Sequence, residues 1–468
     1  MAEELLTPSA NVVTISEVSV KSERLGDEPY HLASLVSEIQ IFENIDLPYL
    51  TGKIMISDMV AVNERINWQG GENVTISVSI PGDPSSELVT KEFVVTHVEH
   101  TVASSDTSQA FILSILEKHA YLSELICLSK AYAGKPEDII RDILKDKLKI
   151  SFEKVDELGE SQQGSMRVVV PNISPLSAVR MMKDRMSNQN GLPYFIYSTL
   201  NDENLIFSNL EQMLSLPILN KKYPYRYGQA YTNYASESHN VYIQATVISD
   251  YKITNTENMF KMLKDGVVAS RYDFVDTTLG DSFSSEVDYE KLTDAKVMER
   301  MVEKNIFTTE QREKIYDDVV KYDDKLLAEF NPNTYAQITT SNSYNDGYLN
   351  YFEERDANKH LQKVQNRILR KYLVKSPLHL EMPGFNFLRR TGQKNLTIGR
   401  QIRVEFLKND QSIYNDEESR AYDTVLDEKR SGDYIIYAMQ HVLRPEYYHV
   451  GMTCSKLANR NSDLQGVA

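Results

Sequence analysis

The most metal-like spacing in this sequence is the pair of histidines in His97-Val98-Glu99-His100. The surrounding alternation of apolar and polar residues predicts a β-strand, on which side chains three positions apart point to opposite faces. Two imidazoles on opposite faces cannot bind one metal ion. We therefore expect both histidines to be structural.

Other short motifs also lack a residue that their chemistry requires. Gly134-Lys135 has no upstream glycine of a phosphate-binding loop, and Pro136 stands where the magnesium-binding Ser or Thr would be. The acidic segment 281–290 lacks the spacing of a calcium loop, and no Gly-x-Ser-x-Gly elbow occurs. With 67 Asp and Glu residues, close acidic pairs arise by chance. We expect no catalytic residue, no cofactor site and no metal site.

A tyrosine-rich segment offers aromatic rings that could stack on nucleic-acid bases. The tyrosines are Tyr223, Tyr225, Tyr227, Tyr231 and Tyr234, and Arg226 lies among them. Packing between domains is the more ordinary role of such a connector. The net charge of −16 also argues against tight binding to nucleic acid, because that binding needs Lys and Arg to displace counterions.

Length and composition indicate a globular protein of several domains. The chain has 468 residues, which is more than one hydrophobic core usually serves. Two cysteines, Cys127 and Cys454, fit a reducing compartment rather than a disulfide scaffold. The acidic start, Met1-Ala2-Glu3-Glu4, is unlike a signal peptide, and no apolar run approaches the ~20 residues of a membrane span. We expect no membrane insertion.

Hydrophobic periodicity divides the chain into two kinds of region. Residues 10–120 alternate with period two and predict an antiparallel β-barrel or sandwich. Residues 121–215 predict a small α+β domain, with helices starting near Pro136 and Pro175 and a hairpin formed by 193–198 and 204–209. Strands return in 216–255 and 360–462. Between them, the acidic segment 256–359 predicts a helical insertion, and a helix over 354–374 follows it.

A weak internal repeat links the two β regions. Residues 93–102 and 109–116 resemble residues 434–443 and 447–454, and a gapless alignment of the leading strands pairs His100 with His441. Chance similarity between two amphipathic hairpins is the alternative. If the repeat is real, it predicts two barrels of one design.

Several motifs together resemble one protein family. The run 32–44, followed by Gly52 and Asp58, resembles the first barrel of the baseplate central hub proteins of contractile-tailed bacteriophages. Residues 387–402 with Gly399, then Gly432 and the strand to His441, resemble the second barrel of that family and of the related late control protein D group. Residues 129–132 and 171–210 are similar to the domain between the barrels.

The resemblance implies a mainly β, α+β fold with two antiparallel tail-tube-like β-barrels, a small α+β domain between them and a helical insertion in the second barrel. It implies a homotrimer whose six barrels join a six-fold tail tube, or its initiator protein, to a three-fold spike or needle protein, within surrounding baseplate wedge proteins. The chain carries no needle-like strand repeat, so the spike is expected to be a separate protein. The protein would be a non-enzymatic component of the virion tail baseplate, assembled in the bacterial host cytoplasm.

The family also implies a channel through which DNA passes without specific binding. We expect polar strand residues such as Glu38 and Gln40 to face this bore, where a negative wall would repel phosphates. Two alternatives stay open: the hub of a phage-derived secretion or injection machine, and a tail-associated cell-wall hydrolase.

Overall fold

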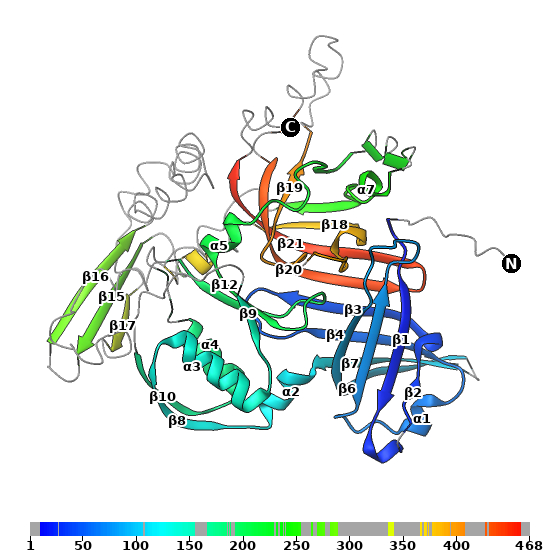
Figure 1. Cartoon of the computed structure of the whole chain (residues 1–468), viewed down its shortest axis with the longest axis horizontal. Coiled ribbons are helices and arrows are strands. Elements are labelled where there is room, and N and C mark those ends of the chain that lie inside the picture. The colour runs from blue at the N-terminus through cyan, green and yellow to red at the C-terminus, as the bar shows by residue number, and fades with distance from the viewer. Residues whose placement is uncertain are drawn as a thin grey trace, which may run out of the picture.

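A computed structural model describes residues 10–154, 166–253, 269–288, 336–340, 366–407 and 426–459, with short gaps inside several of these ranges. Most of this part of the chain is antiparallel β-structure (Figure 1). A 13-stranded sheet joins both ends of the chain, in the order β14-β18-β21-β20-β3-β4-β7-β6-β5-β1-β2, with β13 and β19 attached at β20. The prediction of a mainly β, α+β fold is confirmed. The sheet pairings of the described residues form no closed barrel, so two closed barrels stay a prediction.

The N-terminal region supplies seven strands to this sheet and contains one short α-helix. Its elements are β1 (Thr14–Lys21), β2 (Tyr30–His31), β3 (Val36–Asn44), β4 (Thr51–Asp58), α1 (Val62–Ile66), β5 (Asn73–Ser79), β6 (Val89–Ser105) and β7 (Ser108–Glu117), with single turns η1 (Glu23–Leu25) and η2 (Ala33–Leu35). The C-terminal region supplies β13 (Tyr225–Arg226), α7 (Val241–Gln244), β14 (Asp250–Ile253), β18 (Pro377–Pro383), η6 (Phe385–Phe387), β19 (Gln401–Glu405), β20 (Gly432–Arg444) and β21 (Tyr447–Asn459).

Two four-strand units with the same pairing order lie side by side in the sheet. The first unit runs β3-β4-β7-β6 and the second runs β14-β18-β21-β20. In each unit, the two strands that come first in the chain pair with each other. The strand that comes last pairs with the second strand on one side and with the third strand on the other. The third strand of each unit, β6 or β20, also pairs along its first half with an extra strand, β5 or β19. The internal repeat predicted from the sequence is therefore present in the topology.

Hydrogen bonds and bulges repeat at matching positions. The third strand of each unit contains a β-bulge, where its register with the last strand of the unit shifts. The bulge lies between Val95 and His97 in β6 and between Ile436 and Ala438 in β20. These positions coincide in the gapless alignment. In each unit, the amide of the glycine two residues before the extra strand donates to the carbonyl of the residue just before the bulge. The amide of that same residue donates to the carbonyl of the residue that follows the glycine. The bonds are Gly71 N to Val95 O (2.8 Å) and Val95 N to Glu72 O (2.9 Å), matched by Gly399 N to Ile436 O (2.9 Å) and Ile436 N to Arg400 O (2.9 Å).

The aligned histidines are not equivalent in environment. His441 is buried in β20, whereas His100 is exposed. The cause is a second bulge in β6, between Glu99 and Val102, where His100 adopts a positive φ of 41°. The extra residue turns the strand and moves His100 away from the core face. The sequence alignment therefore has the correct register up to Glu99 and fails beyond it.

The region between the two units forms a small α+β domain. Its elements are α2 (Lys118–Glu124), β8 (Leu128–Gly134), α3 (Pro136–Ile143), η3 (Leu144–Leu148), β9 (Phe152–Lys154), β10 (Met166–Ile173), α4 (Pro175–Lys183), β11 (Tyr194–Tyr197), β12 (Leu205–Asn209) and α5 (Leu210–Ser215). Both predicted helices begin with proline in the first turn, where its missing N–H costs no hydrogen bond. The predicted hairpin is β11 and β12.

This domain shares its hairpin with the large sheet. Alternate residues of β11 belong to two different cores: Tyr194 and Ile196 pack in the small domain, while Phe195 and Tyr197 pack against the large sheet. All four residues are buried because both faces of the strand are covered. The hairpin therefore holds the small domain firmly against the sheet.

The described part of the acidic insertion is a small sheet rather than helices. Strands β15 (Ala269–Asp276), β16 (Asp281–Asp288) and β17 (Ala336–Thr340) pair in the order β16-β15-β17. The prediction of a helical insertion is wrong for these residues, because β15 and β16 place aromatic and β-branched residues among polar ones with strand periodicity. The predicted helix near 308–331 lies outside the described residues. Of the helix predicted over 354–374, the described residues 366 and 369–371 are helical.

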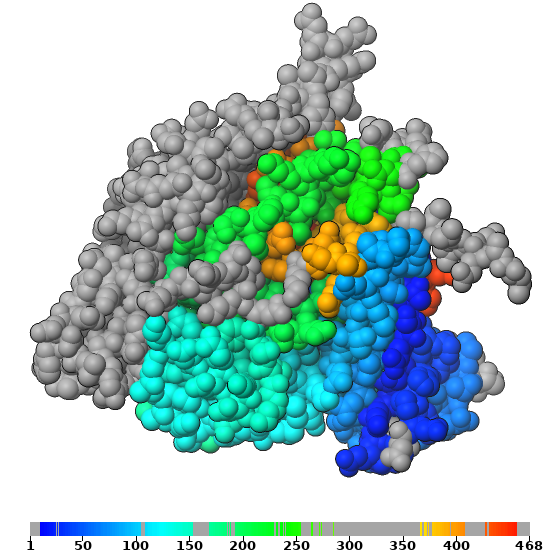
Figure 2. Space-filling model, viewed as in Figure 1, coloured from blue at the N-terminus to red at the C-terminus, as the bar shows by residue number. Residues whose placement is uncertain are grey.

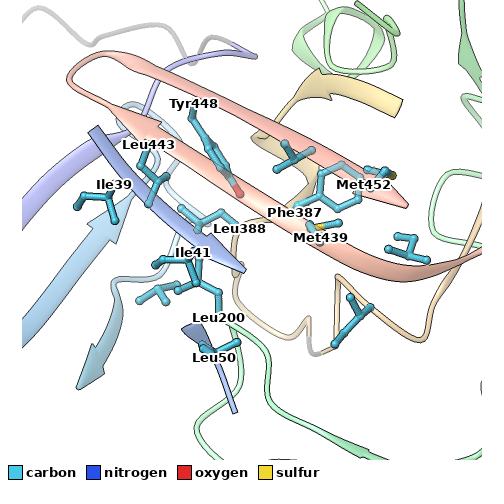
Figure 3. Close-up of a cluster of buried hydrophobic side chains, with 14 of the residues drawn as sticks. Ile39, Ile41, Leu50, Leu200, Phe387, Leu388, Met439, Leu443, Tyr448 and Met452 are labelled. Atoms are coloured by element: carbon cyan, nitrogen blue, oxygen red, sulfur yellow. The ribbon is translucent and has the colours of Figure 1, made fainter. Parts of the chain in front are cut away.

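One hydrophobic core lies where the two units meet. Strand β20 of the second unit pairs with β3 of the first, from Ala438 with Asn44 to Leu443 with Ile39. Ile39, Ile41 and Leu443 point into the core there, where they meet residues from the loop after β18 and from the small domain (Figure 3). The two units therefore share one continuous core.

Candidate functional surface

Strand β3 separates polar from apolar side chains on its two faces. Ile39 and Ile41 are fully buried in the core, while Glu38 and Gln40 point to the other side. Cross-strand pairs extend this second face on both sides of β3, because directly paired residues project to the same face. We name it the polar sheet face. Its residues are His379, Glu381, His449, Thr453, Gln440, Val442, Glu38, Gln40, Phe42, Thr51, Lys53, Met55, Ile112, Ser114, His97 and Glu99.

The polar sheet face crosses the junction between the two units without interruption. Gln40 of the first unit pairs with Val442 of the second, and Phe42 pairs with Gln440. An ion pair also crosses the junction, because Arg444 donates from Nε to a Glu38 carboxylate oxygen at 2.6 Å. This face is therefore a single surface formed by both repeats.

Glu38 is held as a paired carboxylate. Gln40 donates a hydrogen bond to one oxygen and Arg444 to the other. Burial raises the pKa of Glu38, but the two hydrogen bonds and the charge of Arg444 outweigh burial and bring the pKa below its ordinary value. Glu38 is ionised at neutral pH, and its charge is balanced by a neighbouring base.

Glu99 is paired in the same way at the β6 end of the face. Lys53 Nζ lies 2.7 Å from one oxygen, and Ser114 donates to the other. The hydrogen bond from Lys53 is the largest cause that lowers the pKa of Glu99 to about 2. His97 Nε2 lies 3.5 Å from the same carboxylate.

The carboxylates of Glu38 and Glu99 are therefore both balanced by neighbouring bases. Both predicted bore residues, Glu38 and Gln40, do lie on one continuous polar face, but Glu38 does not present a free carboxylate. The face offers charges of both signs in close pairs, whose fields largely cancel a few ångströms away.

Gly52 and Asp58 both have clear structural roles in β4. A Cβ at Gly52 would lie 2.7 Å from the Gln40 carbonyl oxygen, so only glycine allows β3 and β4 to approach this closely. Asp58 accepts hydrogen bonds from the amides of Val60, Val62 and Asn63 at 2.8–3.0 Å and thereby caps α1. Burial raises the pKa of Asp58, but the backbone hydrogen bonds outweigh it and lower the pKa. These residues shape the sheet without forming a site.

Gly399 and Gly432 flank the extra strand of the second unit. Gly399 has a φ of 76°, and a Cβ there would lie 2.5 Å from the hydroxyl of Tyr197. Gly432 has a φ of 154° and begins β20, opposite Val404 of β19. Gly399 is thus one point of contact between the hairpin of the small domain and the second unit.

His441 belongs to a buried polar cluster that the sequence did not indicate. Its Nδ1 lies 2.8 Å from the Tyr448 hydroxyl, and its Nε2 lies 3.1 Å from Glu43 Oε1. The same Glu43 oxygen accepts a hydrogen bond from the amide of Leu200 at 2.5 Å. Glu43 lies two positions after Ile41, so its side chain projects to the apolar face of β3. This strand periodicity could have predicted that Glu43 is buried.

Within the described ranges, no group of three or more His, Cys, Asp or Glu side chains is arranged to hold a metal ion. No helix of that part of the chain is both long and apolar enough to cross a membrane. His97 lies in the regular part of β6, which pairs with β7 without a shift from His97 to Glu99, whereas His100 lies in the bulge between Glu99 and Val102.

Comparisons with known proteins find similarity at the level of structure. No protein-family model and no curated protein sequence matches the chain. A tail protein from Neisseria meningitidis MC58 aligns over 94% of this chain and 96% of its own length, with 10% identity and a TM-score of 0.47. The 43 kDa tail protein of prophage MuSo2 from Shewanella oneidensis covers 94% and 98%, with 10% identity and a TM-score of 0.49.

A component of the type VI secretion system of Escherichia coli also aligns, over 95% of this chain and 76% of its own length, with 8% identity and a TM-score of 0.39. The two tail proteins align over nearly the whole of this chain and nearly the whole of their own length.

Proposed function

We propose that this protein is the structural hub of a contractile tail baseplate and that the polar sheet face lines its central channel. The observation that carries the proposal is the repeated strand order with its matching bulges and hydrogen bonds. A repeat of this kind lets one chain present two similar surfaces in a row. Three chains would then present six.

The junction inside the chain indicates how copies would join. Within the chain, the second half of β20 pairs with β3. The second half of β6 corresponds to the second half of β20, and the outer edge of β14 corresponds to the edge of β3 that pairs with β20. Among the described residues, no strand pairs with either of these edges. Because an unpaired edge is a ready template for another strand, we propose that β6 of one copy pairs with β14 of the next. Head-to-tail pairing of this kind closes into a ring when the rotation between successive copies divides a full turn evenly, as three copies related by a three-fold axis would.

The differences between the units suggest why such a ring could meet partners of two symmetries. The inner four strands agree in order, but the outer strands do not: β1 runs antiparallel to β5, whereas β13 runs parallel to β19. Three copies would thus be close to six-fold at the channel and three-fold outside. We propose a homotrimer that joins a six-fold tail tube to a three-fold spike, surrounded by wedge proteins, in the virion tail.

The ring can be tested by mass and by cross-linking. Native mass spectrometry and electron microscopy of the purified protein should show trimeric rings. In a Cys127→Ser background, a cysteine at one of positions 101–103 together with Lys252→Cys should form a disulfide between chains. Lys21→Cys with Lys252→Cys is the control and should not cross-link. A monomer at all concentrations, with or without a spike partner, would exclude the proposed assembly.

Passage of DNA is proposed to depend on the balance of charge on the polar sheet face. Glu38→Lys would remove one acid and leave Arg444 unpaired beside a second base, so phosphates would be retained in the channel. Ejection should be slower than for the matched Glu38→Gln variant. Equal ejection kinetics for the two variants would show that the face does not contact DNA.

We also propose that the protein is not an enzyme, and that a phage rather than a secretion machine is its setting. A zymogram on peptidoglycan should show no clearing. Clearing abolished by one carboxylate substitution would instead establish the hydrolase alternative. Neighbouring genes for a capsid and a terminase would distinguish a phage from an injection machine.

A further inference from the structure

A cavity of about 450 Å³ lies between the connector that follows α5 and the loop that follows β18. The two segments, 217–246 in green and 386–400 in orange, lie side by side on the surface in Figure 2. This volume falls within the range of about 300–1,000 Å³ that is usual for ligand pockets. The walls combine apolar residues such as Pro217 and Leu396 with tyrosine rings and amide side chains.

The charged residues that line the cavity are all bases, namely Lys222, Arg390 and Arg400, in a chain whose net charge is −16. Arg390 is already neutralised, because its Nε donates to Asp83 at 2.9 Å and its guanidinium stacks on Phe385. The other two bases have no carboxylate partner among the described residues. The cavity therefore has an unbalanced positive charge.

Arg400 is fixed in position with one donor left over. Its two terminal nitrogens donate to the carbonyls of Asn395 and Pro217 at 2.7 and 2.9 Å. Its Nε is buried and has no hydrogen-bond partner within the described chain. The side chain lines the cavity, so the charge of its guanidinium attracts an anion placed there. Lys222 contacts the ring of Tyr223 and keeps its ammonium group available.

The cavity lies on the side of the sheet away from the polar sheet face. Leu380 of β18 and Met452 of β21 pair with each other and belong to the core, as does Phe387, which lies near Met452 in Figure 3. Tyr225, which lines the cavity, stacks on the outer side of this layer with its ring 6.1 Å from that of Phe387. If the polar sheet face lines the channel, as proposed above, the cavity faces away from the channel and a ligand reaches it from outside the ring.

We propose that this cavity binds an acidic peptide segment of another protein, with an aspartate or glutamate carboxylate placed between Lys222 and Arg400. Apolar and tyrosine walls suit the rest of a short peptide. Nucleic acid fits less well, since a phosphate backbone requires a stripe of bases along its path. Here the basic residues surround a single cavity.

A fluorescein-labelled hexaglutamate peptide is the probe, and its binding is measured by anisotropy at low and moderate salt. The unmodified full chain should bind hexaglutamate and should not bind hexaglutamine. Lys222→Gln and Arg400→Gln should each weaken binding about fivefold or more, because each removes a charged donor. Lys21→Gln, a charge-matched change on exposed β1, should leave binding unchanged.

Lys222 makes no hydrogen bond that the fold needs, so Lys222→Gln keeps the test valid even if Arg400→Gln fails to fold. Absence of hexaglutamate binding at millimolar concentration would overturn the proposal. So would equal loss of binding in the Lys21→Gln control. Tighter binding of a six-nucleotide thymidine strand than of hexaglutamate would identify a nucleic-acid site instead. The outcome does not depend on trimer formation, so the hub proposal stands or falls separately.

Discussion

Gly399→Ala should destabilise the fold more than an otherwise matched glycine substitution nearby. Gly392 has a φ of 77° with no heavy atom within 4 Å of the place where a Cβ would lie, whereas Gly399 has a φ of 76° and its Cβ would meet the Tyr197 hydroxyl at 2.5 Å. The two positions therefore share the same backbone strain and differ in space. This pair separates the cost of conformation from the cost of crowding.

The expected loss in the free energy of unfolding is the sum of a backbone cost and an overpacking cost. An alanine in the left-handed region costs about 1–2 kcal/mol, which is the whole expected effect of Gly392→Ala. Tyr197 is fully buried and cannot swing into solvent, so Gly399→Ala adds about 1–3 kcal/mol of overpacking. Gly71→Ala, at the equivalent position of the first unit, should fall between them, because its Cβ would lie 3.3 Å from the Tyr121 hydroxyl.

Urea denaturation of the three variants measures these differences as shifts of the unfolding midpoint. Adding Tyr197→Phe to Gly399→Ala removes the nearest atom and should recover part of the loss, which a double-mutant cycle detects. If Gly399→Ala and Gly392→Ala lose the same free energy of unfolding, the hairpin of the small domain does not pack tightly against the second unit at Gly399.

Three further predictions concern single side chains. Asp58→Ala should cost about 1–2 kcal/mol in urea denaturation, because three backbone amides lose their acceptor. The folded pKa of Glu38 lies below its ordinary value, so its ion pair with Arg444 stabilises the fold above pH 4.5 and is lost as the pH falls; Glu38→Gln should flatten that part of the stability profile, and an unchanged acid profile would contradict the pairing. Lys183 is buried, and burial lowers its pKa to about 8, so the unfolded chain binds more protons above that pH; stability should rise from about pH 8 to about pH 9.5 in the native protein and not in Lys183→Met.

Local pattern predicted the elements well where period and turn chemistry agreed. The helices at Pro136 and Pro175, the hairpin of β11 and β12, and strands β19 to β21 follow from apolar spacing and from residues that start or stop an element. The insertion shows the limit of composition, since its acidic character suggested helices where β15 and β16 form strands.

The internal repeat shows where a one-dimensional alignment ends. Residues 93–99 and 434–440 align correctly because both strands carry the same bulge. A further bulge then separates His100 from His441, and a bulge depends on the pairing partner as much as on the bulged strand. The sequence could not reveal it.

The sequence by itself determined the main strands outside the acidic insertion and which face of β3 is apolar, and it indicated a repeat between the two ends of the chain. Only the tertiary structure decided that β20 lies against β3, that Arg444 pairs with Glu38 across 406 positions, and that Glu43 is buried beside His441. The physical reason is that alternation and turn chemistry act between near neighbours in the chain. Strand order and ion pairing depend on which distant surfaces bury one another.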